Sequence, residues 1–293
     1  MSRLPTLWKA NLIAFISSFC VMVIELIAAR ILAPYIGVSL YTWTSIIGII
    51  LAGIALGNYL GGKLADKRPS PILLMLIFFA SALAIILILP AIKIVAQGDW
   101  FGNLPVLWNF VLKTAFIFFL PAIILSMVSP MVIKLTLSDL GRTGGIVGTI
   151  YAFSTAGSIL GTFLTGFYLI LWLGTARLVW LAAGVLILTG ILTWLVWATH
   201  KFKFSVKNFL IWMAIFEVIL AAAILYQFRG RWEKTYDVES SYYAIRVLPG
   251  DGNLKMLVLD DMIHSYVDTE DATNLEYFYL KVFDGIVKRV MEN

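Results

Sequence analysis

The residues most able to do chemistry lie in a short acidic stretch between Asp260 and Glu276. This stretch holds six carboxylates and neither Lys nor Arg: Asp260, Asp261, Asp268, Glu270, Asp271 and Glu276. His264, Tyr266 and Tyr277 lie among them. Carboxylates and aromatic rings together can bind an alkylammonium group through charge and cation–π attraction. The alternative is a solvated loop before a helix, because a helix N-terminus favours acidic residues.

A second group of candidates consists of charged residues inside long apolar stretches, namely Glu25, Arg30, Lys113 and Glu217. A charge at the centre of a bilayer costs about 2.5 to 3.5 kcal/mol on insertion scales, so each residue needs a partner or water. Glu25 and Arg30 are separated by about 140° around a helix, so we expect Glu25 to face another helix. Two interpretations stay open, a structural ion pair such as Glu25 with Lys113 and an acidic site for a cationic amine.

Patterns for other chemistries are missing from the sequence. It contains no Gly-x-Ser-x-Gly motif, no Gly-rich phosphate loop of the Walker kind and no strand-anchored G-x-G-x-x-G. Cys20 is the single cysteine, which excludes an intramolecular disulfide and a cysteine-based metal cluster. We therefore expect no metal site and no cofactor bound by this chain alone.

The elements that position these residues are mostly membrane helices. The composition, 61% hydrophobic and 13% charged, is too apolar for an ordinary soluble domain. With about 20 apolar residues per crossing, residues 1–228 predict an α-helical multi-pass bundle of seven spans. These spans are roughly 11–34, 42–62, 71–96, 106–136, 146–172, 176–199 and 208–227. We interpret the fourth span as one helix kinked at Pro121 and Pro130.

Small residues recur at helical spacing on two of these spans. The second span carries Gly53, Gly57 and Gly61, and the fifth carries Gly148, Ala152, Ala156, Gly157 and Gly161. Such stripes let helix backbones approach closely, so we interpret them as packing surfaces. A substrate path is the alternative.

The distribution of charge predicts the orientation and the partners. Residues 1–228 hold 14 Lys and Arg against 5 Asp and Glu, whereas residues 229–293 hold 8 against 12. The basic residues lie in alternate loops that share a side with the N-terminus, which predicts a cell-membrane protein with a cytoplasmic N-terminus. The expected partners are the lipid bilayer, a diamine or polyamine and, as an open alternative, a second copy of the chain. Nothing indicates nucleic acid.

Residues 229–293, the head, have a different pattern. Alternating residues predict strands near 243–248, 255–260 and 262–267, and Pro249 to Asn253 forms a turn. A helix is expected from Asn274, capped by Thr273 or Asn274. Its predicted apolar face is Leu275, Phe278, Val282, Ile286 and Val290. The head is thus a small antiparallel β domain followed by one helix.

The segment from Gly62 to Arg68, Gly-Lys-Leu-Ala-Asp-Lys-Arg, resembles the cytoplasmic loop signature of the major facilitator superfamily. Pro69-Ser70-Pro71 departs from the later part of that signature. Six spans before His200 would equal one half of such a transporter, so the resemblance implies half of a major facilitator fold.

Three segments resemble multi-pass membrane spermidine synthase-like proteins. Glu25 to Pro34, continuing to Trp43, is similar to their membrane domain. Ser240 to Val247 and Leu257 to Asp260 are similar to the strand-rich N-terminal domain of spermidine synthases. The resemblance covers nearly the whole chain, in the order of membrane domain and then synthase head.

The resemblance implies transfer of an aminopropyl group from decarboxylated S-adenosylmethionine, the co-substrate, to a diamine such as putrescine. It implies that Tyr242, Tyr243, Leu259, Tyr277 and Phe278 lie at the substrate site, although Tyr243 and Phe278 replace family glutamines. The catalytic Asp is expected in a Rossmann-like domain that this chain does not contain, so this chain is expected to be a fragment without turnover.

Two hypotheses from other classes stay open. One is a polyamine or other cation transport or sensing protein with a degenerate head, in which Glu25 and Glu217 form the working part. The other is a scaffold whose head only binds a partner.

Overall fold

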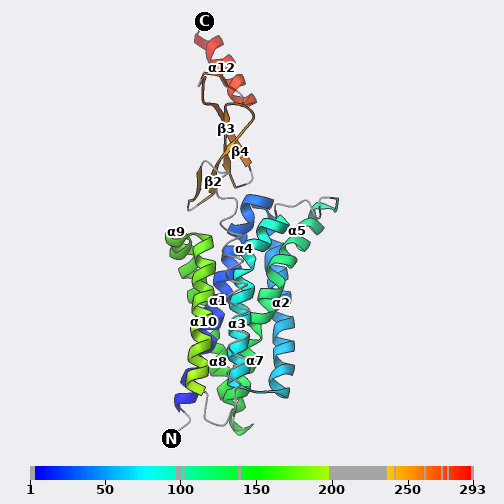
Figure 1. Ribbon diagram of the computed structural model, residues 1–293, viewed down its shortest axis with the longest axis vertical. Helices are drawn as coiled ribbons and strands as arrows, with labels where there is room; N and C mark the ends of the chain where they lie inside the picture. Colours follow the sequence, from blue (N-terminus) through cyan, green and yellow to red (C-terminus); the bar gives the residue numbers. More distant parts are fainter. Residues whose placement is uncertain are drawn as a thin grey trace. The chain divides into compact units, whose positions relative to one another are not determined.

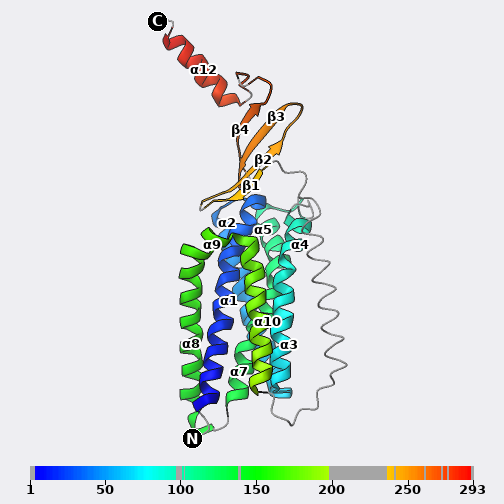
Figure 2. The ribbon, with the colours of Figure 1, turned by 60° about the vertical axis from the view of Figure 1, so that its left-hand side comes forward.

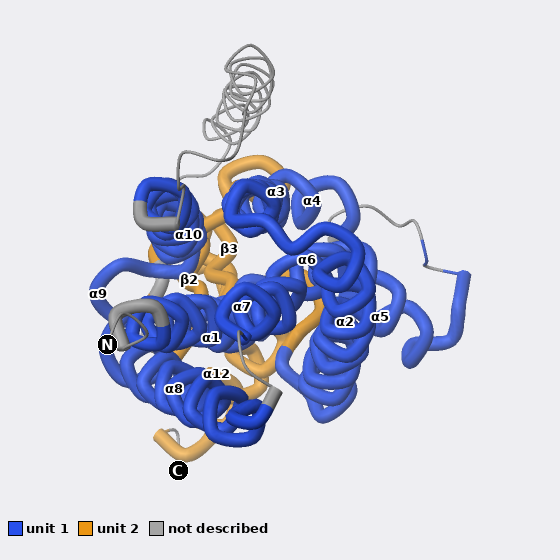
Figure 3. The backbone as a smooth tube through the Cα atoms, turned by 90° about the horizontal axis from the view of Figure 1, so that it is seen from below, with its two compact units in different colours: residues 1–32, 38–227 blue, residues 33–37, 228–293 orange. Residues whose placement is uncertain are grey.

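A computed structural model describes residues 4–96, 101, 103–137, 140–197, 236–240, 242–260, 262–271, 273–275 and 277–291. The chain divides into two compact units, residues 1–32 with 38–227 and residues 33–37 with 228–293 (Figure 3). The seventh predicted span, 208–227, and its Glu217 lie outside the described residues.

Six of the seven predicted spans are confirmed as helices long and apolar enough to cross a membrane. In the first unit these helices run side by side (Figures 1 and 2). Single helices make the first, second and sixth spans: α1 (Leu4–Ile36), α2 (Leu40–Lys67) and α10 (Thr175–Trp197). The third span joins α3 (Pro71–Ile86), α4 (Ile88–Ala91) and the π-helical η1 (Ile92–Ala96). The fourth joins α5 (Val106–Thr114), η2 (Ala115–Phe119, π-helical), α6 (Leu120–Ser126) and α7 (Val128–Thr136).

The fifth span follows a single 3-10 turn, η3 (Leu140–Arg142). It joins α8 (Thr143–Leu164), the π-helical η4 (Thr165–Leu169) and α9 (Ile170–Leu173). Large apolar side chains lie on its exterior, including Phe163, Phe167 and Trp172. Water does not solvate such a surface favourably, so the exterior is compatible with a lipid environment.

Prolines explain the interruptions inside the spans. A proline lacks an amide hydrogen, and its ring clashes with the carbonyl four residues earlier, so the helix must widen or turn. The π-helical η2 ends directly before the Leu120-Pro121 pair, and a turn at Met127 precedes Pro130 by three residues. A turn at Leu87 precedes Pro90 in the same way. The prediction of one kinked helix over 106–136 is confirmed.

The glycine stripe on α2 is a packing surface. A Cβ atom built on Gly53 would lie 2.7 Å from the Ala122 Cβ, and one on Gly61 would lie 2.7 Å from the Met127 Cα. One on Gly57 would overlap the carbonyl oxygen of Ile123. These neighbours belong to α6 and to the turn at Met127, so bare backbone lets α2 contact the fourth span along three successive turns.

The small residues of the fifth span divide between two faces. Gly157 and Gly161 contact the backbone of α1 at Phe15 and Phe19, and Ser154 hydrogen-bonds to Ser18 of α1. By contrast, Gly148 has nothing within 4 Å of its Cβ position, and Ala152 and Ala156 are exposed. The packing interpretation is therefore wrong for this second set, because residues one position apart point about 100° away from each other.

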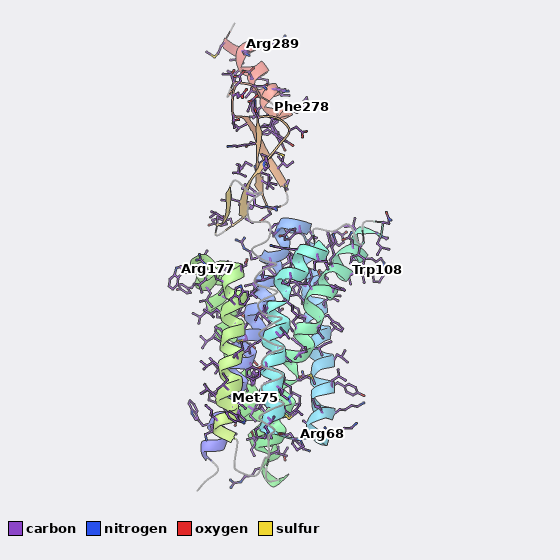
Figure 4. The ribbon with its side chains drawn as sticks, viewed as in Figure 1. Arg68, Met75, Trp108, Arg177, Phe278 and Arg289 are labelled. Carbon is purple, nitrogen blue, oxygen red and sulfur yellow. The ribbon has the colours of Figure 1, made fainter. Side chains whose placement is uncertain are left out.

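The helix α2 is longer than expected and includes most of the loop-like signature. It extends through Lys67, and only Arg68 to Ser70 connect it to α3. Ser70 caps α3 by accepting the amide hydrogen of Ile72 at 3.3 Å. Asp66 pairs with Lys134 near the end of α7 at 2.7 Å. Figure 4 shows Arg68 at one end of the bundle and Trp108 and Arg177 at the other.

The head contains a four-stranded antiparallel meander rather than the three predicted strands. Its order is β1 (Tyr236–Glu239), β2 (Ala244–Pro249), β3 (Leu254–Leu259) and β4 (Met262–Asp268). The added strand β1 pairs Val238 with Ile245. We did not predict it because four residues, two of them acidic, give too short an alternation to recognise.

Replacing two α2 glycines by alanine tests the packing. We expect Gly57→Ala to lower the free energy of unfolding by about 1 to 3 kcal/mol, because its Cβ overlaps the fourth span. Gly48→Ala is the matched control, since nothing lies within 4 Å of its Cβ position. Denaturant unfolding in detergent measures both. Equal stability of the two variants would contradict the close contact.

Candidate functional site

Asp260 organises the end of the head sheet where β3 turns into β4. Leu259 pairs with Met262, and Asp260 between them has a φ of 53°, a conformation that Asp tolerates in tight turns. Its carboxylate Oδ1 accepts the amide hydrogen of Ala244 at 2.9 Å, and its own amide donates to the Ala244 carbonyl at 2.9 Å. Arg246 also donates to the Asp260 carbonyl. Asp260 is buried and structural, not a free carboxylate for a ligand.

Tyr242 and Tyr243 lie in the turn that precedes β2. The Ser240 hydroxyl oxygen accepts both of their amide hydrogens, at 3.2 and 2.9 Å, which fixes the turn. Their side chains are 79% and 49% exposed. Leu259 of β3 is half-buried and pairs with Ile245 of the neighbouring strand β2. Tyr243 and Leu259 are therefore both next to the Ala244–Asp260 link.

Tyr277 lies in an aromatic cluster beside β4. Its hydroxyl donates to the carbonyl of Ile263 at 2.6 Å, and its ring centroid is 5.4 Å from Tyr266 and 5.0 Å from Tyr279. Phe283 extends the cluster at 6.3 Å from Tyr279. The spacing of Tyr279 and Phe283 indicated only a helix, so the sequence reading missed their membership of this cluster.

The loop between β4 and the last helix is folded by two carboxylates. Asp268 accepts the amide hydrogens of Glu270 and Asp271 and a side-chain hydrogen of Asn274, at 3.0, 3.3 and 3.2 Å. Asp271 accepts from the amide and hydroxyl of Thr273, at 3.0 and 2.6 Å. The backbone hydrogen bond from Glu270 contributes most to lowering the pKa of Asp268, and the Thr273 hydroxyl contributes most to lowering the pKa of Asp271.

This loop corrects the predicted start of the helix. The helix α12 covers Phe278–Met291 and not the residues from Asn274. Asp268 and Asp271 fold residues 268–274 into turns, and the side chain of Asn274 donates to Asp268 instead of capping a helix. No residue of α12 is buried, so its predicted apolar face lies exposed, beginning with Phe278 at 79% (Figure 4).

Some of the head residues lie near the end of the hairpin where β3 turns into β4. Ile263, which accepts from the Tyr277 hydroxyl, pairs with Val258, next to Leu259. Tyr266 and Asp268 are two residues apart on β4 and share one face of the sheet. The aromatic cluster thus extends from the turn end of the hairpin toward Asp268, which pairs with Leu254 at the other end. Such a surface can bind an alkylammonium group.

The charged residues of the bundle are not brought together as an ion pair. Glu25 is half-buried in α1 and Lys113 is buried in α5, and within the described helices no ion pair joins them. Arg30 is half-buried five residues after Glu25. Four buried polar atoms of the described part of this unit lack a hydrogen-bond partner: Asn11 Oδ1, Ser45 Oγ, Thr114 Oγ1 and Thr165 Oγ1. No pattern in the sequence indicated these four atoms.

Among the described residues no group of three or more His, Cys, Asp or Glu side chains could hold a metal ion. No family model, curated protein or solved structure matches this chain.

The titration of Asp268 tests the folded loop. Its pKa is lowered from the usual value of 3.8, so the loop is stabilised above that value and loses this stabilisation as the pH falls through the lowered pKa. We expect the carboxyl carbon of Asp268 to titrate below pH 3.8 in a carbon-13 NMR experiment on Asp-labelled chain. The signal is assigned by its disappearance in Asp268→Asn. A midpoint at or above 3.8 would contradict the hydrogen bonding.

Proposed function

We propose that the chain is a membrane-bound spermidine synthase-like protein whose head forms the amine side of an aminopropyl transfer. The donor in this proposal is decarboxylated S-adenosylmethionine and the acceptor is a diamine such as putrescine. The amine nitrogen attacks the carbon beside the sulfonium, forming a C–N bond as the C–S bond breaks. The resemblance assigns the group that takes the amine proton to a Rossmann-like domain.

The observation that supports this proposal is the convergence of Tyr243, Leu259 and Tyr277 at one end of the β3–β4 hairpin. These residues are up to 34 positions apart in sequence. Tyr243 and Leu259 are the chain neighbours of Ala244 and Asp260, which bond to each other, and the Tyr277 hydroxyl bonds to Ile263 of β4. The aromatic cluster adds ring faces, and Asp268 adds a negative charge. Together they suit the cationic end of a diamine.

The exposed side of α12 supports a further domain in the complete protein. Phe278, Phe283, Ile286 and Val290 are 79, 61, 54 and 71% exposed. Exposed apolar side chains of this kind on a polar domain are typical of a surface that binds another domain. A nucleotide-binding domain of the kind that the resemblance implies would supply one.

Amine binding by the head tests the proposal. We expect purified chain in detergent to bind putrescine, and Tyr277→Ala to weaken binding about twofold to fivefold, the size of an exposed cation–π contact. Tyr277→Phe keeps the ring and loses only the bond to Ile263. Tyr168→Ala, on the π-helical η4 of the bundle, is the control and leaves binding unchanged. Binding that is unaffected by Tyr277→Ala would contradict the site.

A label-transfer assay on the same preparation separates binding from chemistry. We expect no aminopropyl transfer from decarboxylated S-adenosylmethionine to putrescine. Turnover by the 293-residue chain would show that the chemistry does not need a further domain.

For the bundle we propose a multi-pass cell-membrane protein with seven crossings, a half-transporter-like arrangement and a cytoplasmic N-terminus. The supporting observations are the six apolar helices of the described residues and the alternation of basic loops.

Labelling a cysteine at residue 240 tests the number of crossings. We expect Ser240→Cys, in a Cys20→Ser background, to react with an impermeant thiol reagent added outside intact cells. Seven crossings place residue 240 opposite the N-terminus, because an odd count changes sides. Reaction only after the membrane is opened would show an even count and would place the head on the side of the cytoplasmic donor.

A further inference from the structure

The helices α1 and α8 run in the same direction and touch along two successive turns. Gly157 meets Phe15, and Gly161 meets Phe19, with the Met22 Cβ at 3.3 Å from its Cβ position. One turn further along, Thr165, the first residue of η4, follows Gly161 by four positions, and Glu25 follows Met22 on α1 by three. The register of the contact therefore brings Glu25 and Thr165 to the same level of the bundle.

Both residues carry an oxygen without a partner. Thr165 is completely buried, and no described residue hydrogen-bonds to its hydroxyl. Several other buried hydroxyls bond to the carbonyl one turn earlier, as Ser81 does to Ile77 and Thr136 does to Val132, at 2.8 and 2.7 Å. Glu25 makes no hydrogen bond or ion pair to any residue that the structure describes. An unpaired polar group in a lipid-facing bundle is costly, so a ligand for these oxygens is favoured.

The backbone at Thr165 adds a third kind of oxygen. Thr165 begins the π-helical η4, in which the Ile170 amide bonds to the Thr165 carbonyl. When a helix returns from i→i−5 to i→i−4 bonding, one carbonyl is skipped and has no amide of its own helix. Single π-helical turns of this kind are frequent at functional sites.

We propose that Glu25, the Thr165 hydroxyl and the skipped carbonyl of η4 bind a monovalent alkali-metal cation such as Na⁺. Carboxylate, hydroxyl and carbonyl oxygens are hard ligands, and unwound backbone carbonyls coordinate Na⁺ in membrane proteins. One carboxylate neutralises one positive charge, whereas a divalent ion would remain charged in a low-dielectric site.

The test measures thermal unfolding of the full chain in detergent. Na⁺ is compared with N-methylglucamine at constant ionic strength, because a ligand that binds only the folded state raises Tm with its concentration. We expect a saturable rise of several degrees with Na⁺ that is lost in Glu25→Gln and reduced in the isosteric Thr165→Val. Asp66→Asn, which removes an exposed carboxylate at one end of the bundle, is the matched control and keeps the rise.

Binding of ²²Na⁺ to the same variants gives a readout that does not depend on stability. One ion per chain, displaced by unlabelled Na⁺ and absent in Glu25→Gln, supports the site. A Tm rise that persists in Glu25→Gln, or wild-type chain without bound ²²Na⁺, overturns it. A Glu25-dependent rise with putrescine but not with Na⁺ would also overturn it and would assign the carboxylate to an amine.

Discussion

Direct contact between helix backbones is the constraint on which the bundle depends. Lipid tails are as apolar as the side chains they would replace, so helices in a membrane gain little from hiding apolar surface and associate through close packing. Gly53, Gly57 and Gly61 let α2 contact the fourth span, and Gly157 and Gly161 let α8 contact α1. Seen from below, α7 lies between α1 and α2 (Figure 3). Each glycine contact fixes the level at which two helices meet, and so decides which polar residues face each other.

Lipid tails also offer no hydrogen bonds, so each buried polar group of the bundle must find its partner inside the protein. A hydroxyl in a membrane helix can bond to the carbonyl one turn earlier at little cost, and Thr189 and Thr193 of α10 do so, each at 2.7 Å. Thr165 differs from them: its amide is shared between the carbonyls of Gly161 and Thr162, and its hydroxyl has no partner among the described residues. The change to π-helical geometry and the unpaired hydroxyl therefore occur together.

The head is held together by other means, since its sheet buries few side chains. Of the described strand and turn residues, Ala244, Val258 and Asp260 are buried. Hydrogen bonds to carboxylates organise the head in place of an apolar core. Asp260 joins β2 to the β3–β4 turn, and Asp268 folds the loop before α12. A head built in this way presents aromatic and apolar side chains on its surface. That is the state expected of a domain that is completed by a substrate or by a neighbouring domain.

The sequence by itself determined the six described spans, the kinked fourth helix and the antiparallel head, because hydropathy, proline and strand alternation act locally. It also indicated that Gly157 and Gly161 pack, but it could not separate them from Gly148, because a spacing pattern does not say which face of a helix meets a neighbour. The tertiary structure decided that Glu25 and Lys113 are not an ion pair and that Asp260 is structural. It also decided that Thr165 lacks a partner and that Asn274 belongs to a loop. Each of these depends on which atoms lie across a helix contact or a hairpin, and residues far apart in the chain supply those atoms.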